Sequence, residues 1–321
     1  MFDTPVLYLI FNRPELTKIT FTSICKMKPK KLFIAADGPR IGNIKDEISC
    51  KIVREYVLSN IDWDCDLKIL FREYNLGCGL SVSSALDWFF SYVDEGIILE
   101  DDCLPSKSFF MFCEIMLEKY RYENVVGHIS GVNLIYNNTN VINNSYSYYF
   151  SAIIHIWGWA TWKRSWKNYN FHLSNISFDN DKKLYNNIFI HEEINTFWSK
   201  KYEDTKNKFI DTWDYQLQFC IWSHNQLSIT PQFNLITNLG FGDEATHTKN
   251  RFDMLSNLPN SEINQIIHPP IIKISSSLDL LMFFYAYNIK FDISLLKWKS
   301  KYIFINRFFK KKLIRYFSDV S

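Results

Sequence analysis

The sequence predicts an α/β fold in which a mostly parallel sheet has helices on both faces and is followed by a C-terminal appendage. Four short apolar runs lie in the first hundred residues, at 6–11, 32–36, 67–71 and 96–100. Such runs are typical of strands covered on both faces, as in parallel sheets. The segments between them are long enough for right-handed helical crossovers. The chain of 321 residues has room for one large domain and an appendage.

Apolar residues at helical spacing lie between and after these runs. The first helix is expected to begin after the run at 6–11, where an N-cap-like Asn12 precedes Pro14 and Glu15. Two later segments each place apolar residues on one helical face: Val82, Ala85, Leu86, Phe89, Phe90 and Val93 in one, and Phe109, Phe112, Cys113, Met116, Leu117 and Tyr120 in the other. In such a β-α-β-α series, ligands collect at the carboxyl ends of the strands.

Composition and charge exclude several classes of protein. The chain is 47% hydrophobic and 22% charged, which excludes disorder as the main state. The net charge of +2 argues against dedicated nucleic-acid binding. The seven cysteines include no CxxC pair, and no apolar run reaches the ~20 residues that span a bilayer, so we expect a cytoplasmic protein.

The end of the chain is basic. Eight basic and no acidic residues lie within 297–315, interleaved with aromatic side chains. Such a segment can lie on an anionic membrane surface, which would make the protein peripheral at the inner face of the membrane. A solvated helix packed on the body of the protein is the alternative.

Three consecutive carboxylates, Glu100, Asp101 and Asp102, follow the apolar run at 96–100. Adjacent like charges at the end of a buried strand raise one another's pKa unless a cation neutralises them. Hard oxygen ligands favour Mg²⁺ or Mn²⁺ over zinc, so the triplet is a candidate metal site. The alternative is a solvated acidic turn.

Two more strand ends carry candidate nucleotide-binding residues. The sequence contains neither a GxxxxGK[ST] motif nor a GxGxxG motif after the first strand, which argues against a P-loop ATPase and a dinucleotide-binding fold. Arg13 follows the first predicted strand and can meet diphosphate oxygens, and Asp37 follows the second and can accept a hydrogen bond from a base or ribose. A surface salt bridge and a turn before Gly38 are the respective alternatives.

A resemblance to a known family rests on the order and spacing of several motifs across residues 5–250. These motifs are FNRP, AADGPR, REYNLGCG, GIILEDDCLPSKSFF, HISGVN, IWGWATW, TWDYQ and NLITNLGFGDEATHT. Together they resemble GT-A (Rossmann-like) glycosyltransferases, in particular bacterial relatives of the N-acetylglucosaminyltransferase I family. The resemblance implies that residues 1–130 bind a nucleotide sugar, that 131–250 bind the acceptor and carry the base, and that 251–321 form the appendage.

The resemblance also implies roles for the residues at the donor end. Asp102 would bind Mn²⁺ with help from Glu100 and Asp101, Asp37 would contact uracil, and Arg13 would lie near the diphosphate. A histidine that the family carries in the helix after the third strand is missing, because this stretch reads Ser-Val-Ser-Ser at 81–84.

The motif Trp157-Gly158-Trp159 is a candidate sugar contact. Aromatic faces pack against the apolar C–H face of a sugar ring, and the resemblance places Gly158 and Trp159 near the donor sugar and the acceptor. Packing in the core is the alternative for each tryptophan.

The motif at 211–216 holds the candidate base. Inverting transfer needs a carboxylate that takes the acceptor's hydroxyl proton. By resemblance Asp214 is the first candidate and Asp211 the second, while both could instead stabilise a helix N-terminus. In the glycine-containing loop that follows, His247 is a candidate metal ligand or diphosphate donor, with a plain surface histidine as the alternative.

These observations together predict a glycosyltransferase that depends on Mn²⁺ or Mg²⁺. It would move a sugar from a nucleoside diphosphate donor, with UDP favoured, to a hydroxyl of a bacterial surface glycan, with inversion, and the acceptor would be a glycan or a lipid-linked saccharide. Two alternatives stay open: a nucleotidyltransferase that makes the activated sugar, and a glycan-binding protein on the same fold. A nucleotidyltransferase would need a glycine-rich loop with Arg and Lys near the N-terminus, and the sequence has no such loop there.

Overall fold

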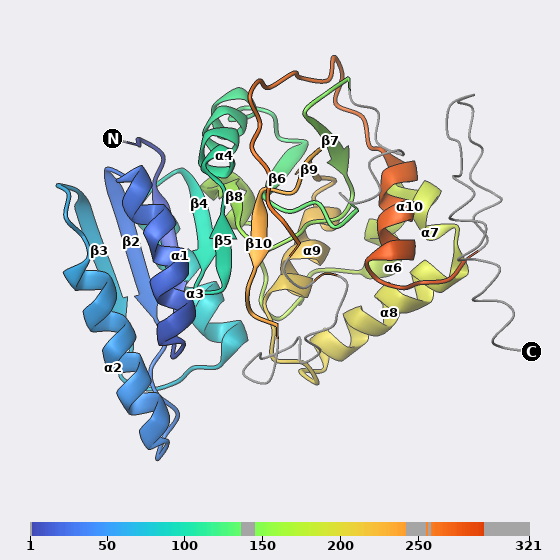
Figure 1. The fold of residues 1–321 in the computed structure, drawn as a ribbon. Helices are drawn as coiled ribbons and strands as arrows, with labels where there is room; N and C mark the ends of the chain where they lie inside the picture. Colours follow the sequence, from blue (N-terminus) through green and yellow to red (C-terminus); the bar gives the residue numbers. More distant parts are fainter. Residues whose placement is uncertain (1, 136–144, 242–254, 256–257, 292–321) are drawn as a thin grey trace, which may run out of the picture.

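A computed structural model describes residues 2–135, 145–241, 255 and 258–291. Its centre is an eight-stranded sheet in the order β3-β2-β1-β4-β8-β6-β9-β7, drawn as a ribbon in Figure 1. The strands of this sheet are β1 (Val6–Ile10), β2 (Lys31–Ala36), β3 (Asp66–Phe71), β4 (Glu95–Glu100), β6 (Val126–Ser130), β7 (Tyr148–Ser151), β8 (Trp159–Trp162) and β9 (Leu227–Pro231).

The four strands predicted from the apolar runs form the parallel half of this sheet. β1 pairs in parallel with β2 and β4, and β2 pairs in parallel with β3. In the other half, β8 runs antiparallel to β4 and β6, β6 and β9 are parallel, and β7 is an antiparallel edge. The predicted fold class, a mostly parallel α/β sheet with helices on both faces, is therefore confirmed.

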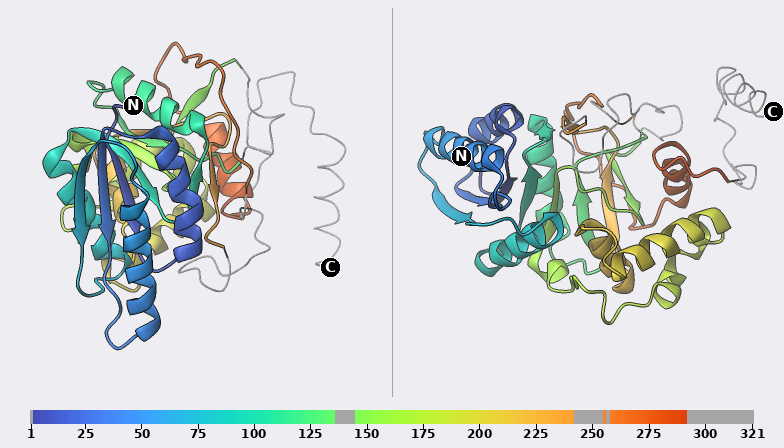
Figure 2. Two further views of the ribbon diagram at one scale, coloured as in Figure 1. Left: turned by 60° about the vertical axis from the view of Figure 1, so that its left-hand side comes forward. Right: turned by 90° about the horizontal axis from the view of Figure 1, so that it is seen from below.

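Alternation along β1 explains why helices cover both faces. Val6, Tyr8 and Ile10 belong to one apolar cluster with residues of α1 (Pro14–Met27), α2 (Ile44–Ser59) and α4 (Lys107–Lys119). Leu7 and Leu9 point the other way, into a cluster with residues of α3 (Cys78–Tyr92) and α9 (Asp214–Ser223). Successive side chains of a strand face opposite sides of the sheet, so one strand supports two layers of helices, which the views in Figure 2 show.

The remaining elements lie mainly in the second half of the chain. Two short strands, β5 (Cys103–Pro105) and β10 (Ile236–Asn238), form a separate antiparallel pair. The other helices are α5 (Lys163–Trp166), α6 (Phe178–Asp181), the 3-10 helix η2 (Lys182–Tyr185), α7 (Asn186–Phe189), α8 (Glu192–Lys206) and α10 (Ser276–Tyr285).

Two local predictions differ from the structure. α1 begins at Pro14 as predicted, but Arg13 is its N-cap residue and makes no side-chain capping bond. Asn12 instead donates a 2.7 Å hydrogen bond to Asp46 at the start of α2. β3 is an edge strand whose residues are half-buried or exposed, because no further strand covers it.

The segment expected as a separate appendage is partly integrated into the domain. In the described range 258–291, the Ser275 N–H donates to the Phe150 carbonyl at 2.8 Å, and α10 buries Leu280 and Phe283 in the main apolar cluster. The expected boundary near residue 250 therefore separates no second core over this range. Residues 292–321, with the basic tail, lie outside the described residues. Of the helices that the structure describes, none has the length and apolar character to cross a membrane.

Candidate active site

A cavity of about 520 Å³ lies beside the carboxyl ends of β1 and β4. Arg13, Glu100 and Asp102 line one part of it. Asp214 lines it from the first residue of α9, and Trp157 from the segment before β8. The structure therefore brings predicted residues from four distant parts of the sequence to one cavity.

The three carboxylates of the triplet point in different directions. Glu100 and Asp102 line the cavity, whereas Asp101 is 5% exposed and turns toward the start of α1. Asp101 accepts hydrogen bonds from the Phe11 N–H at 3.2 Å and from Arg13 Nη1 at 3.1 Å. The same Arg13 nitrogen donates to Asp102 Oδ2 at 2.8 Å. Arg13 thus joins the end of β1 to the end of β4.

Negative charge at this position is only partly compensated. Burial, reinforced by the neighbouring carboxylates, raises the pKa of Glu100 to about 8. Burial also raises the pKa of Asp101 to about 6, against the opposing effect of Arg13. When all three carboxylates are ionised, one guanidinium leaves two negative charges in the site. This excess fits a divalent cation held by oxygen ligands.

The number of ligands limits how such an ion is held. Within the described ranges, no three His, Cys, Asp or Glu side chains are grouped closely enough to hold a metal. Of the triplet, Glu100 and Asp102 are the two carboxylates that face the cavity. Mg²⁺ is commonly bound by one or two carboxylates together with substrate phosphates, so the residues fit a metal that arrives with a phosphorylated ligand. His247 lies outside the described residues.

The turn after β10 lies directly on the triplet. β10 pairs with β5, which follows the triplet in the chain, and the Leu239 N–H donates to the Asp102 carbonyl at 2.8 Å. A Cβ atom on Gly240 would lie only 2.1 Å from Asp102 Oδ2. A side chain at position 240 would therefore force the Asp102 carboxylate or the turn itself to shift.

The two candidate bases occupy different environments. Asp214 is half-buried in the cavity wall, and its Oδ1 accepts hydrogen bonds from Thr212 Oγ1 and, at 2.9 Å, from the Tyr215 N–H. In the described part of the chain no hydrogen-bond donor is paired with Asp214 Oδ2. The geometry thus holds one oxygen of this carboxylate and leaves the other for a ligand.

Asp211 is engaged elsewhere. Its two oxygens accept hydrogen bonds from the backbone N–H groups of Cys78 and Gly79, each at 2.9 Å, at the N-terminus of α3. A Cβ atom on Gly79 would lie 2.8 Å from Asp211 Oδ1, so this glycine makes room for the contact. The position supports helix capping for Asp211 and favours Asp214 as the base.

The expected sugar contact at Trp159 is wrong. This side chain is completely buried, with His128 stacked on it at 5.2 Å and Trp213 at 5.5 Å between ring centroids. It is the first residue of β8 and points into the core layer beneath α3 and α9. Trp157, two residues earlier, lines the cavity instead.

Two other predicted nucleotide or sugar contacts face protein. Gly158 has φ +61°, and a Cβ atom there would lie 2.5 Å from Ile236, so its role in the structure is close packing. Asp37 is buried and does not line the cavity. Its carboxylate accepts hydrogen bonds from the N–H groups of Gly38 at 2.9 Å and Leu76 at 3.0 Å, and from Asn75 Nδ2 at 2.8 Å. These bonds use both of its oxygens to join two loops.

Several residues that line the cavity were not predicted. Trp198 and Lys201 come from α8, Tyr215 from α9, and Tyr287 from the turn after α10. The i, i+3 spacing of Trp198 and Lys201 was the available signal, because it places both side chains on one face of a helix. Nothing in that spacing indicates which element the face meets.

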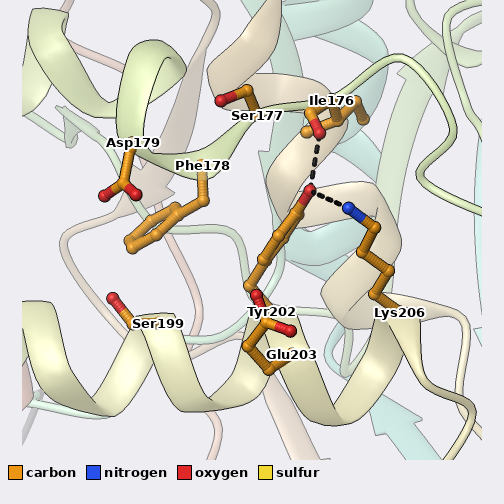
Figure 3. A pocket seen from close by; sticks show the side chains of 8 residues that line it. All are labelled: Ile176, Ser177, Phe178, Asp179, Ser199, Tyr202, Glu203 and Lys206. Carbon is orange, nitrogen blue, oxygen red and sulfur yellow. Dashed lines mark hydrogen bonds between the residues drawn. The ribbon is translucent and has the colours of Figure 1, made fainter.

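A second cavity, of about 240 Å³, lies between the segment that begins α6 and helix α8 (Figure 3). There Tyr202 donates a 2.6 Å hydrogen bond to the Ile176 carbonyl, and Lys206 Nζ donates to the Tyr202 hydroxyl at 3.3 Å. None of the predicted site residues lines it. The larger cavity is therefore the candidate active site.

No protein-family model and no curated protein matches the sequence. Among solved structures, the mannosyltransferase PcManGT from Pyrobaculum calidifontis, in complex with GDP-Man and Mn²⁺, is 16% identical, with 56% of this chain and 49% of that chain covered and a TM-score of 0.35. S. aureus TarS 1-349 is 10% identical, with 71% and 58% covered and a TM-score of 0.37. A UDP-glucose pyrophosphorylase complexed with UDP-glucose is 10% identical, with 52% and 79% covered and a TM-score of 0.29.

The chain thus spans about half the length of PcManGT and of TarS 1-349. At these identities and TM-scores, the similarity is limited to part of the fold. The functional argument therefore depends on the residues that this chain brings to its own cavity.

Proposed function

We propose that this protein is a glycosyltransferase that moves a sugar from a nucleoside diphosphate donor to an acceptor hydroxyl. The observation that carries the proposal is the arrangement of the larger cavity. It has the acidic end of β4 with Arg13 on one wall and Asp214, with one oxygen available, on another. An acidic metal-binding end and a separate carboxylate are the two groups that displacement of a diphosphate with inversion requires.

The donor end would be formed by Arg13, Glu100 and Asp102. A divalent ion, Mn²⁺ or Mg²⁺, held by Glu100 and Asp102 would offset the charge that develops on the departing diphosphate. Arg13 keeps Asp102 oriented toward the cavity and can share a phosphate oxygen. Gly240 lets the turn after β10 lie against Asp102, which narrows access of water to the donor end. The sequence resemblance favours UDP as the nucleotide of the donor.

The acceptor end would be formed around Asp214. Its Oδ2 is the atom that would take the proton of the attacking hydroxyl, while Thr212 and the Tyr215 N–H hold Oδ1 in place. Trp157 offers a ring face to the sugar. A bacterial surface glycan on a lipid carrier, reached by a membrane-bound tail, is the acceptor setting that the sequence suggests.

Donor binding can be tested by thermal shift of the full chain with UDP and GDP, each with and without Mn²⁺. A nucleotide at 100 times its Kd should stabilise the wild type by about 2.7 kcal/mol, and only with metal present. Asp102→Asn should abolish the shift. Asp62→Asn is the matched control, because Asp62 is an exposed carboxylate paired with Lys28 on the surface. An unchanged shift in Asp102→Asn would contradict the proposed metal site.

Turnover separates the proposal from its competitors. Asp214→Asn should keep nucleotide binding and lower transfer or donor hydrolysis by about 10²- to 10⁴-fold. Release of pyrophosphate from a nucleoside triphosphate and a sugar phosphate would instead identify a nucleotidyltransferase. Metal-dependent nucleotide binding without hydrolysis or transfer across an acceptor panel would identify a glycan-binding protein.

A further inference from the structure

The cavity has a second end, which is lined by aromatic rings and one lysine. α8 contributes Trp198 and Lys201, α9 contributes Tyr215, and Tyr287 follows α10. The Trp198 ring centroid lies 6.0 Å from that of Tyr215 and 6.2 Å from that of Tyr287. Trp198 is 2% exposed and packs behind the two tyrosines, whereas Tyr215 and Tyr287 are half-buried and can meet the C–H face of a sugar.

Lys201 is the unusual member of this group. Its Nζ lies 4.9 Å from the ring centroid of Tyr215 and 5.6 Å from that of Phe197, so two aromatic rings hold the ammonium. In the part of the chain that the structure describes, it forms no ion pair with a carboxylate. Arg13, which also lines the cavity, is bonded to Asp101 and Asp102. Lys201 therefore brings positive charge to the cavity that no described carboxylate neutralises.

The position of Lys201 associates it with the acceptor. It contacts Tyr215, the residue directly after the proposed base, whereas the triplet and Arg13 form the proposed donor end. The triplet end is the proposed place of the metal and the donor diphosphate, so a second anionic group has to bind elsewhere in the cavity. Among the described residues that line the cavity, Lys201 can pair with an anion without breaking an ion pair to a carboxylate.

We propose that the aromatic end of the cavity binds an acceptor saccharide that carries an anionic group, a carboxylate or a phosphate, with Lys201 as its counter-ion. This inference rests on the proposed function and adds the chemical class of the acceptor. Sugar rings pack on the aromatic wall, and the charged hydrogen bond to Lys201 sets the orientation of the acceptor. Lys201 would thus determine specificity without taking part in proton transfer.

Two neighbouring lysines provide a matched test. Lys201 lines the cavity, whereas the side chain of Lys200 is 74% exposed and pairs with Asp204. We would titrate full-chain wild type, Lys201→Met, Lys201→Arg and Lys200→Met with methyl glucuronide, glucose 1-phosphate and the neutral methyl glucoside by calorimetry. At least one anionic saccharide should bind with the same affinity to the wild type, Lys201→Arg and Lys200→Met. Its affinity for Lys201→Met should be about 10- to 100-fold lower. Methyl glucoside should bind all four proteins equally. The probe that binds identifies the anionic group.

Three results of the saccharide titrations would overturn the inference. These are anionic probes that bind no more tightly than methyl glucoside, equal binding to Lys201→Met and the wild type, and equal losses in Lys201→Met and Lys200→Met. UDP and GDP with Mn²⁺, titrated into the same samples, separate the two proposals. Loss of nucleotide binding in Lys201→Met would assign the lysine to the donor and also overturn the inference. Absence of nucleotide binding in the wild type would defeat the proposed function, whatever the saccharides do.

Discussion

Replacement of Asp211 with alanine should destabilise the protein by about 1–2 kcal/mol, because its carboxylate caps a helix that has no cap of its own. α3 follows Gly77, which has no side chain to accept a hydrogen bond. Asp211 instead accepts hydrogen bonds from the N–H groups of Cys78 and Gly79, each at 2.9 Å. Asp211 is exposed, so water replaces part of what the substitution removes, and the expected loss stays within the range for an N-cap residue.

Urea unfolding and thermal melting of the full chain measure this loss. For a chain of this size, a change of 1 kcal/mol in the free energy of unfolding shifts Tm by at most about 2–4 °C. Asp62→Ala is the control, because its exposed ion pair with Lys28 should contribute no more than about 1 kcal/mol. A change of less than about 0.5 kcal/mol in Asp211→Ala would refute the capping argument. Lost turnover with unchanged stability would return Asp211 to the role of base.

Three other predictions test the site and the core. Gly240→Ala should abolish metal-dependent nucleotide binding in thermal-shift assays, because the added Cβ lies 2.1 Å from Asp102 Oδ2. Normal binding would show that the turn moves away freely. Trp159→Ala should lower the free energy of unfolding by about 3–5 kcal/mol, whereas Trp157→Ala should cost much less; equal losses would contradict their assignment to core and cavity. Burial raises the pKa of Asp279 to about 7, and an unfolded aspartate titrates near about 3.9, so the folded state holds this proton more tightly. The contribution of Asp279 to stability is therefore complete below pH ~4 and is lost as the pH rises to ~7. Urea unfolding measured across this range should show that the free energy of unfolding of Asp279→Asn changes less with pH than that of the wild type. Parallel pH dependences of the two proteins would contradict the prediction.

The parallel half of the fold could be predicted from local sequence. β1, β2 and β4 are buried on both faces, so their apolar runs carry a strong signal, and the observed strands agree within a residue or two. The position of Glu100 at the end of β4 follows from the same signal, because the chain leaves the sheet where the apolar run stops. The exposure of β3 was not predictable, since edge position depends on strand order.

The choice between neighbouring candidates in the site was beyond local sequence. Asp211 and Asp214 lie three residues apart, yet one caps α3, which is more than a hundred residues earlier in the chain, and the other lines the cavity. Trp157 and Trp159 share one motif, but only the second has entered β8 and the core. In both pairs the side chains are chemically equivalent, and contacts with distant elements decide their roles.

By itself, the sequence determined the positions of three buried parallel strands, where the acidic triplet leaves the sheet and which residue types could carry out sugar transfer. These properties depend on the polarity and spacing of nearby residues. Only the tertiary structure decided which of those residues share a cavity, and it added Lys201 to them. Side chains converge when strand order and helix packing place them together, and those arrangements are set by contacts between segments far apart in the chain.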